Sequence, residues 1–178
     1  MAESKVVSTP LRPNTKLTLE CTSEVIPSTL YRPIIGSLLY LTASRPDIMY
    51  SVGSVARFQS NPRSSHLQAA KRILRFVNGT LSYGLHDLVS PTLPFKTYSA
   101  TDWGGSLLDK SSTLGCCYLL GSNIISRLSK NQAIVSLSTF ETEYITTSQA
   151  GSQLLWMTTT LTDLGLQFSG PPKLYCEN

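Results

Sequence analysis

The spacing of hydrophobic and polar positions changes near the middle of the chain. In the first half, apolar residues recur every three or four positions, as on one face of a helix. This spacing predicts helices over about 29–43, 46–58 and 64–78. From Phe95 onward the apolar residues form short runs separated by turns, which predicts strands. The pattern therefore predicts an α/β protein in which a helical part precedes a sheet.

Prolines, glycines and capping residues set the expected boundaries of the helical part. Residues 1–28 are polar and contain scattered prolines, which predicts an extended arm. Pro46 followed by Asp47 favours a helix start, and Asn78-Gly79 favours a helix end. The residues from there to about 93 predict a strand or hairpin followed by a linker.

The second half predicts a mixed sheet with one long helix. Three short β-type runs predict a meander of strands: 95–101, 113–120 and 123–129. Ser138-Thr139-Phe140-Glu141 is a capping box, which predicts a helix that continues to about Leu164 and stops at Gly165. A last strand is expected at 173–176, parallel to an earlier one, because it follows a long crossover helix. The predicted order is β-β-β-α-β.

Charge and composition narrow the classes of partner. The net charge is +4, which is compatible with a polyanionic partner without requiring one. The third predicted helix has an apolar face of Leu67, Ala70, Leu74 and Val77, and it also carries Lys71, Arg72 and Arg75. These three cations are candidates for nucleic-acid contacts, and the competing interpretation is a solvated helix face.

Other compositional signals point away from membranes and secretion. No apolar run approaches the roughly 20 residues of a membrane span, and the first ten residues lack an apolar signal core. The four cysteines show no metal-ligand spacing, so reduced thiols in a cytoplasmic or nuclear protein are expected. His66 and His86 have no neighbouring Cys or acidic ligands at metal-site spacing, and no small-molecule cofactor is expected.

Several motifs then carry a resemblance to a known family. The first group lies at 31–42, 45–48, 69–76, 79–80 and 83–85, and the second at 102–105, 110–115 and 137–144. The first group resembles the end of a copia-type retrotransposon reverse transcriptase, and the second resembles the ribonuclease H domain that follows it. The resemblance extends over about 8–178 and includes no polymerase palm, so polymerase activity of this chain alone is not expected.

This resemblance implies a division of the chain. Residues 1–28 would be an N-terminal arm, and 29–93 would be a helical segment like a reverse-transcriptase thumb or connection. Residues 94–178 would form a truncated ribonuclease H-like domain with a mixed sheet. The final strand would then pair beside the 95–101 strand and bring Glu177 near Ala100.

Ribonuclease H chemistry uses a cluster of carboxylates that holds two Mg²⁺ ions about 4 Å apart. The resemblance places the first-strand acid at Ala100, which has no carboxylate, and the helix acid at Glu143. It places the fourth-strand acid at Glu177, where the family has a shorter Asp, and the fourth acid on later elements. Asp102 lies on the same strand face as Ala100 but roughly 6.6 Å along the strand. Only weak metal binding, at Glu143 and Glu177, is therefore expected.

Each of these acids also has an ordinary structural interpretation. Asp102 suits a turn, Glu143 suits the first turns of a helix, and Glu177 suits a solvated position near the end of the chain. Trp103 is expected to pack rather than to shape the site.

Three functions remain open on this evidence. The first is a catalytically impaired, retrotransposon-derived ribonuclease H-like protein whose ancestors processed RNA–DNA hybrids. The second is an active Mg²⁺-dependent ribonuclease H that cuts the RNA of such hybrids. The third is a non-catalytic module that binds nucleic acid or protein through the same scaffold.

Overall fold

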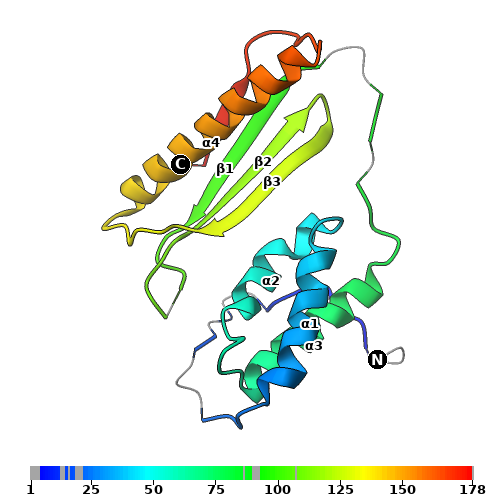
Figure 1. The fold of residues 1–178 in the computed structure, drawn as a ribbon, viewed down its shortest axis with the longest axis vertical. Helices are drawn as coiled ribbons and strands as arrows, with labels where there is room; N and C mark the ends of the chain where they lie inside the picture. Colours follow the sequence, from blue (N-terminus) through cyan, green and yellow to red (C-terminus); the bar gives the residue numbers. More distant parts are fainter. Residues whose placement is uncertain are drawn as a thin grey trace. The chain divides into compact units, whose positions relative to one another are not determined.

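The computed structural model describes residues 5–12, 15, 17–18, 22–85, 87–89, 93–106 and 108–177. The chain divides into two compact units, Met1–Gly84 and Leu85–Asn178, and each is described by itself. One unit contains helices α1, α2 and α3, and the other contains α4 and a four-stranded mixed sheet (Figure 1). The protein is therefore mixed α/β. None of the helices in the described ranges is long and apolar enough to cross a membrane.

The helical unit has its helices where the apolar spacing predicts them. They are α1 (Ser28–Leu41), α2 (Met49–Ala56) and α3 (Ser64–Gly79), and a short 3₁₀ turn, η1 (Pro46–Ile48), precedes α2. Their buried side chains form one core: Tyr31, Ile35, Leu38, Ile48, Val52, Val55, Phe58, Ala69, Ala70, Ile73 and Phe76. The polar end of the most deeply buried ring is satisfied, because the Tyr31 hydroxyl donates to the Val55 carbonyl at 2.8 Å.

The predicted apolar face of α3 packs on the core, but it lies at the edge of the most deeply buried stripe. Ala70 is fully buried, but Leu67, Leu74 and Val77 are only partly buried. The fully buried stripe of α3 instead contains His66, Ala69, Ala70, Ile73 and Phe76. The spacing alone is compatible with either choice, and the direction from which α1 and α2 approach decides between them.

The expected strand or hairpin before residue 93 is wrong. The described residues between Thr80 and Leu93 form a turn and irregular chain with no strand. Leu81, Tyr83 and Leu85 are exposed, so this run has no layer to pack against. An apolar run forms a strand only where it pairs with a neighbouring strand and packs against another layer.

The arm before α1 has irregular structure in its described residues, as expected, and it packs on the helices. Val7, Leu11 and Leu17 contact the core, and Val25 forms an isolated β-bridge with Arg63. The Arg63 guanidinium also donates to the Ser23 carbonyl at 3.1 Å.

The sheet has the meander and the parallel return that the sequence predicts. Its strands are β1 (Phe95–Asp102), β2 (Thr113–Leu120), β3 (Asn123–Asn131) and β4 (Lys173–Cys176). Their spatial order is β3-β2-β1-β4, with β4 parallel to β1 and the other pairs antiparallel. Helix α4 (Thr139–Asp163) lies over one face, as Figure 1 shows. The core between them contains Phe95, Leu114, Cys116, Tyr118, Ala150, Leu154 and Met157.

Half of the expected capping box is present at the start of α4: Ser138 caps Glu141, but the Glu141 side chain bonds Leu137 and not the Ser138 N–H. Ser138 Oγ accepts a hydrogen bond from the Glu141 N–H at 3.2 Å, and the Glu141 carboxylate accepts one from the Leu137 N–H at 2.6 Å. These bonds satisfy donors that a helix start otherwise leaves unpaired. At the other end, Gly165 has φ +84°, the left-handed conformation that suits a helix stop. Residues close to each end of α4 therefore predict where the helix begins and ends.

Candidate functional site

A shallow pocket lies where β1, β4 and the first half of α4 meet. Its empty volume is about 160 Å³, which includes space open to solvent. The residues that line it are Ser99, Ala100, Thr101, Glu143, Thr146, Thr147, Cys176 and Glu177. The pocket therefore gathers three of the positions that the sequence singles out, namely Ala100, Glu143 and Glu177.

Strand register brings Glu177 beside Ala100. Ser99 pairs with Cys176, and the Glu177 N–H donates to the Ser99 carbonyl at 3.2 Å. Successive residues of a strand point to opposite faces, and Cys176 faces α4, where its Sγ lies 3.3 Å from Thr147 Oγ1. Glu177 consequently points to the other face of the sheet, together with Ala100.

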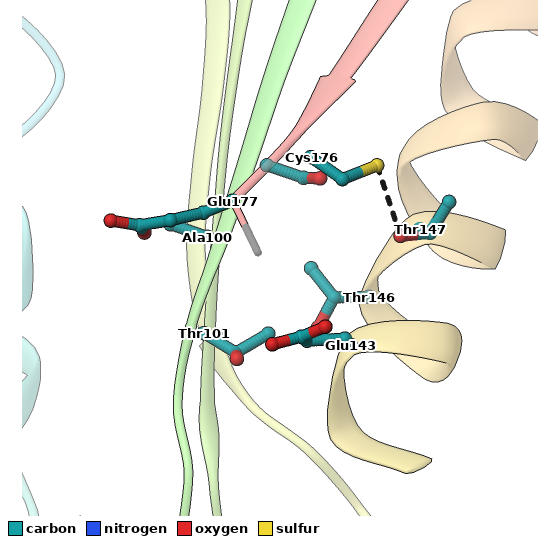
Figure 2. Close-up of a pocket in the computed structure, with 8 residues that line it drawn as sticks. Ala100, Thr101, Glu143, Thr146, Thr147, Cys176 and Glu177 are labelled. Carbon is teal, nitrogen blue, oxygen red and sulfur yellow. Dashed lines mark hydrogen bonds between the residues drawn. The ribbon is translucent and has the colours of Figure 1, made fainter. Parts of the chain in front are cut away.

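The two glutamates of the pocket do not face a common point. Figure 2 shows the Glu143 carboxylate on the helix side of β1, near Thr101. The Glu177 carboxylate extends away from α4, on the side where Ala100 lies. A shared divalent ion would need both carboxylates within coordination distance of one position. The arrangement thus leaves Glu143 as the carboxylate that points into the pocket.

Asp102 stands at the end of β1, where the chain turns. Its carboxylate lies against Gly105, where a Cβ would fit only if the Asp102 side chain moved. The same turn contains Gly104 at φ +57°. This geometry fits the turn interpretation of Asp102, which is outside the residues that line the pocket.

The donor set therefore does not fit a two-ion Mg²⁺ centre. Mg²⁺ demands near-octahedral oxygen ligands at about 2.1 Å. In the described part of the chain, no group of three or more His, Cys, Asp or Glu side chains could hold a metal ion. At Ala100 a methyl group occupies the place that the resemblance assigns to a bridging acid.

A buried polar network holds the start of α4 against the sheet. Gln132 donates to the Thr142 carbonyl at 3.0 Å and to Thr146 Oγ1 at 3.1 Å, and it accepts from Ser136 Oγ at 3.0 Å. Ser112 Oγ lies 3.4 Å from Thr142 Oγ1 and accepts from the Gly104 N–H at 3.1 Å. The network fixes where Glu143 stands, because it holds the helix turn that carries this residue.

Sequence reasoning missed this network, although one signal for it existed. Thr142 and Thr146 continue the stripe of Ala150 and Leu154 at four-residue spacing, and all four are buried. Polar residues in line with a buried apolar stripe need partners, since an unpaired buried hydroxyl is costly. The identity of the partner, Gln132, depends on strand pairing and was not predictable from spacing.

Trp103 lies at the turn after β1 and forms a hydrogen bond through its indole N–H. Its ring is half exposed, and its Nε1–H donates to the Ser136 carbonyl at 3.2 Å. This bond ties the turn after β1 to the segment before α4. The side chain supports the pocket without lining it.

The thiols in the described residues are free. Cys116 is buried, and burial raises the pKa of its thiol, which keeps it protonated and unreactive. Burial also raises the pKa of Cys117, and the charge of Arg127 opposes that effect. Cys176 is exposed at the pocket. Cys21 and His86 lie outside the described residues.

The basic residues of α3 lie in the helical unit. Lys71 is exposed, whereas Arg72 and Arg75 are half buried. The Arg72 guanidinium donates to Thr9 Oγ1 at 2.9 Å and so binds the arm. A structural role, binding the arm, thus accounts for Arg72, one of the three candidate nucleic-acid contacts.

His66 has a structural role that the sequence did not indicate. Its Nδ1 accepts from the Arg63 N–H at 3.0 Å, and its Nε2 lies 3.0 Å from the Thr18 carbonyl, so this nitrogen carries the proton. The ring stacks on Phe58 with 3.8 Å between centroids. Burial lowers the pKa of this imidazole, so the neutral form is favoured.

Comparison with known proteins decides the family. The chain is 40% identical over all 178 of its residues to the retrovirus-related Pol polyprotein from transposon RE1 of Arabidopsis thaliana. It is 36% identical over 181 aligned positions, 93% of the chain, to the Pol polyprotein from transposon TNT 1-94 of Nicotiana tabacum. The chain belongs to the copia-type retrotransposon Pol family. It spans 12% of the length of the RE1 polyprotein and 13% of TNT 1-94.

A shorter relative shares most of its own length with this chain. Secreted RxLR effector protein 161 of Plasmopara viticola is 36% identical over 129 residues, which are 72% of this chain and 91% of that protein. No protein-family model and no solved structure matches the chain. The Pol relationship therefore rests on sequence identity along the whole chain.

Proposed function

We propose that residues 94–178 are a ribonuclease H-like domain of RNA–DNA hybrid-processing ancestry whose catalysis is impaired. Residues 29–93 are, in the same proposal, the end of the reverse-transcriptase segment that precedes it. Identity to the copia-type Pol polyproteins supports the retrotransposon origin. The order β-β-β-α-β, with β4 parallel to β1, supports a ribonuclease H-like arrangement.

One observation carries the impaired state. Ala100 occupies the strand position beside Glu177, while the Glu143 and Glu177 carboxylates point to different sides of β1 (Figure 2). Hybrid hydrolysis by two ions requires acids that converge on both of them. Catalytic groups are usually held within about 0.5 Å of the productive geometry, and two carboxylates on different sides of β1 do not meet that requirement.

The decisive assay is cleavage of a labelled RNA–DNA hybrid by the full chain, with Mg²⁺ and separately with Mn²⁺. We expect no metal-dependent product, and no difference between the unmodified chain and Glu143→Gln. Cleavage that Glu143→Gln abolishes would instead establish an active ribonuclease H. Cleavage that survives this substitution would indicate a contaminating nuclease.

A second measurement tests the site assignment without using activity. Ala100→Asp combined with Glu177→Asp places two acids side by side on β1 and β4. Isothermal titration with Mn²⁺ should then detect binding that the unmodified chain lacks, since adjacent carboxylates repel until a cation neutralises them. Lys96→Asp with Lys173→Asp, a second pair on the same two strands, is the control for added charge. Equal Mn²⁺ binding by both pairs would remove the special status of Ala100.

A further inference from the structure

The face of the sheet opposite α4, called here the outer sheet face, carries a distinctive set of side chains. Phe95, Thr97 and Ser99 are buried on the α4 side, so Lys96, Tyr98 and Ala100 lie on the outer sheet face. On β4 the same alternation places Lys173 and Tyr175 there, because Leu174 packs into the core under α4. The register partners of these β1 residues on β2 and β4 lie on the same face.

Two tyrosines form an exposed aromatic pair on this face. Tyr98 and Tyr175 are register partners on parallel strands, and their rings stack with 5.0 Å between centroids and 15° between planes. They remain 48% and 42% exposed. Because the two rings are stacked side by side, they present a joint aromatic surface to solvent, which is suited to a contact with another flat group.

Small residues leave room beside the rings. Cys117 pairs with Tyr98 on the side away from Tyr175, and the next pair along the same face is Ala100 with Gly115. The two rings touch each other, so a planar group has no space between them. It can stack on the free side of the pair, above the small side chains.

Positive charge adjoins the aromatic pair. Lys96 pairs in register with Lys173, which places two ammonium groups on neighbouring strands of the outer sheet face. Like charges opposite each other destabilise a sheet, and an anion between them reverses the sign of that interaction. Arg127 lies in the register row of the tyrosines, beyond Cys117, and so adds a third cation to the same face. Asp102 and Glu177 lie toward the opposite end of β1, so the face has a basic end and an acidic end.

We propose that the outer sheet face binds single-stranded nucleic acid, with bases stacked on the Tyr98–Tyr175 pair and phosphates at Lys96 and Lys173. Aromatic rings interleaved with cations are the combination that single strands require. In a duplex the bases are already stacked on one another and cannot offer their faces to protein rings. The proposal does not depend on the metal site or on hybrid cleavage.

The test is fluorescence anisotropy of the full chain with dye-labelled oligothymidylate and oligouridylate of about 12 nucleotides, within the usual site size. Tyr98→Leu with Tyr175→Leu should raise Kd about tenfold, the order of effect expected for a lost stacking contact. Tyr98→Phe with Tyr175→Phe keeps the rings and should leave Kd within about twofold. Phe140→Leu with Tyr144→Leu removes two exposed aromatics from α4 and should leave Kd unchanged.

A salt titration tests the phosphate contacts separately. Each phosphate contact on a single strand contributes about 0.7 to the slope of log K against log salt, so Lys96→Gln with Lys173→Gln should reduce the slope by about 1.4. Lys5→Gln with Lys130→Gln removes the same charge from two exposed positions elsewhere and should leave the slope unchanged. Circular dichroism establishes that each variant is folded.

Several results would overturn the proposal. They are absence of salt-dependent binding by the unmodified chain, unchanged Kd in the leucine pair, and a slope that falls only in the Lys5/Lys130 control. A duplex of the same length that binds equally well and ignores the tyrosine substitutions would also overturn it. So would a change of oligomeric state in the leucine pair, because the surface would then hold a second copy of the chain.

Discussion

The helical unit and the sheet unit use their polar side chains in opposite ways. In the helical unit, Arg45, Arg63 and Arg72 donate to Thr80, Ser23 and Thr9, and His66 binds Arg63 and Thr18. In the sheet unit, the polar network is internal, while Tyr98, Tyr175 and Lys173 stand exposed on the sheet.

The difference shows that a basic residue is evidence of a ligand only after its structural partners are known. The α3 cations were candidates for nucleic-acid contacts because of their charge, yet Arg72 binds the arm. The sequence did not mark Lys96 and Lys173 as candidate contacts. Strand pairing nevertheless sets them side by side, next to two stacked rings. The structure therefore favours Lys96 and Lys173 as candidate ligand contacts, whereas the sequence favoured the cations of α3.

The largest expected effect is on the helical unit. His66→Ala removes an acceptor from the Arg63 N–H, a donor to the Thr18 carbonyl and a ring stacked on Phe58. We expect it to destabilise this unit by about 3 kcal/mol, through a cavity and an unpaired buried group. Urea unfolding followed by circular dichroism measures the change.

The positions of the tryptophans allow the unfolding of the sheet unit to be followed separately from that of the helical unit. The chain has two, Trp103 and Trp156, and both lie in the sheet unit. Tryptophan fluorescence should therefore report an unchanged transition in His66→Ala, and Gln68→Ala, an exposed position on α3, serves as the control. A parallel shift of the fluorescence transition would mean that the two units unfold together.

A smaller destabilisation, of the sheet unit this time, is expected from a substitution at Gln132. Gln132→Ala removes the acceptor of Ser136 Oγ and one hydrogen bond each from Thr146 Oγ1 and the Thr142 carbonyl, which still bond each other at 2.9 Å. The expected cost is about 2 kcal/mol, which is typical of an interrupted buried network. The fluorescence transition should move to lower urea and the helical-unit transition should stay. Gln153→Ala, at an exposed position of α4, should move neither, and a loss no larger than in this control would show that the network is not stabilising.

The smallest effect is a pH dependence confined to the helical unit. Burial lowers the pKa of His66 below its ordinary value of 6.5, so the unfolded chain binds the proton more tightly than the folded one. The stabilisation by neutral His66 is complete above pH 6.5 and is lost as the pH falls below that value. Helical unfolding between pH 7.5 and about 5 should show this loss, and His66→Gln should remove it. An identical loss in the glutamine variant would assign the pH dependence to other groups.

The sequence by itself determined the local elements. The spacing of apolar residues gave α1, α2 and α3 to within a few residues, and the S-x-x-E motif with Gly165 gave both ends of α4. These features depend on contacts between residues three or four positions apart, which a single sequence displays directly. The return of β4 parallel to β1 was also predictable, because a crossover helix of this length permits few alternatives. That Ala100 stands where the family has an acid was implied by the resemblance alone.

Only the tertiary structure decided which side chains meet. The buried stripe of α3, the partner of Thr142 and the stack of Tyr98 on Tyr175 all join residues far apart in the chain. The directions of Glu143 and Glu177 depend on the same packing, since a strand presents alternate residues to opposite faces once its register is fixed. Pairing and packing choose among arrangements that local patterns leave equally acceptable. The separation of the two glutamates and the exposed aromatic pair are consequences of that choice.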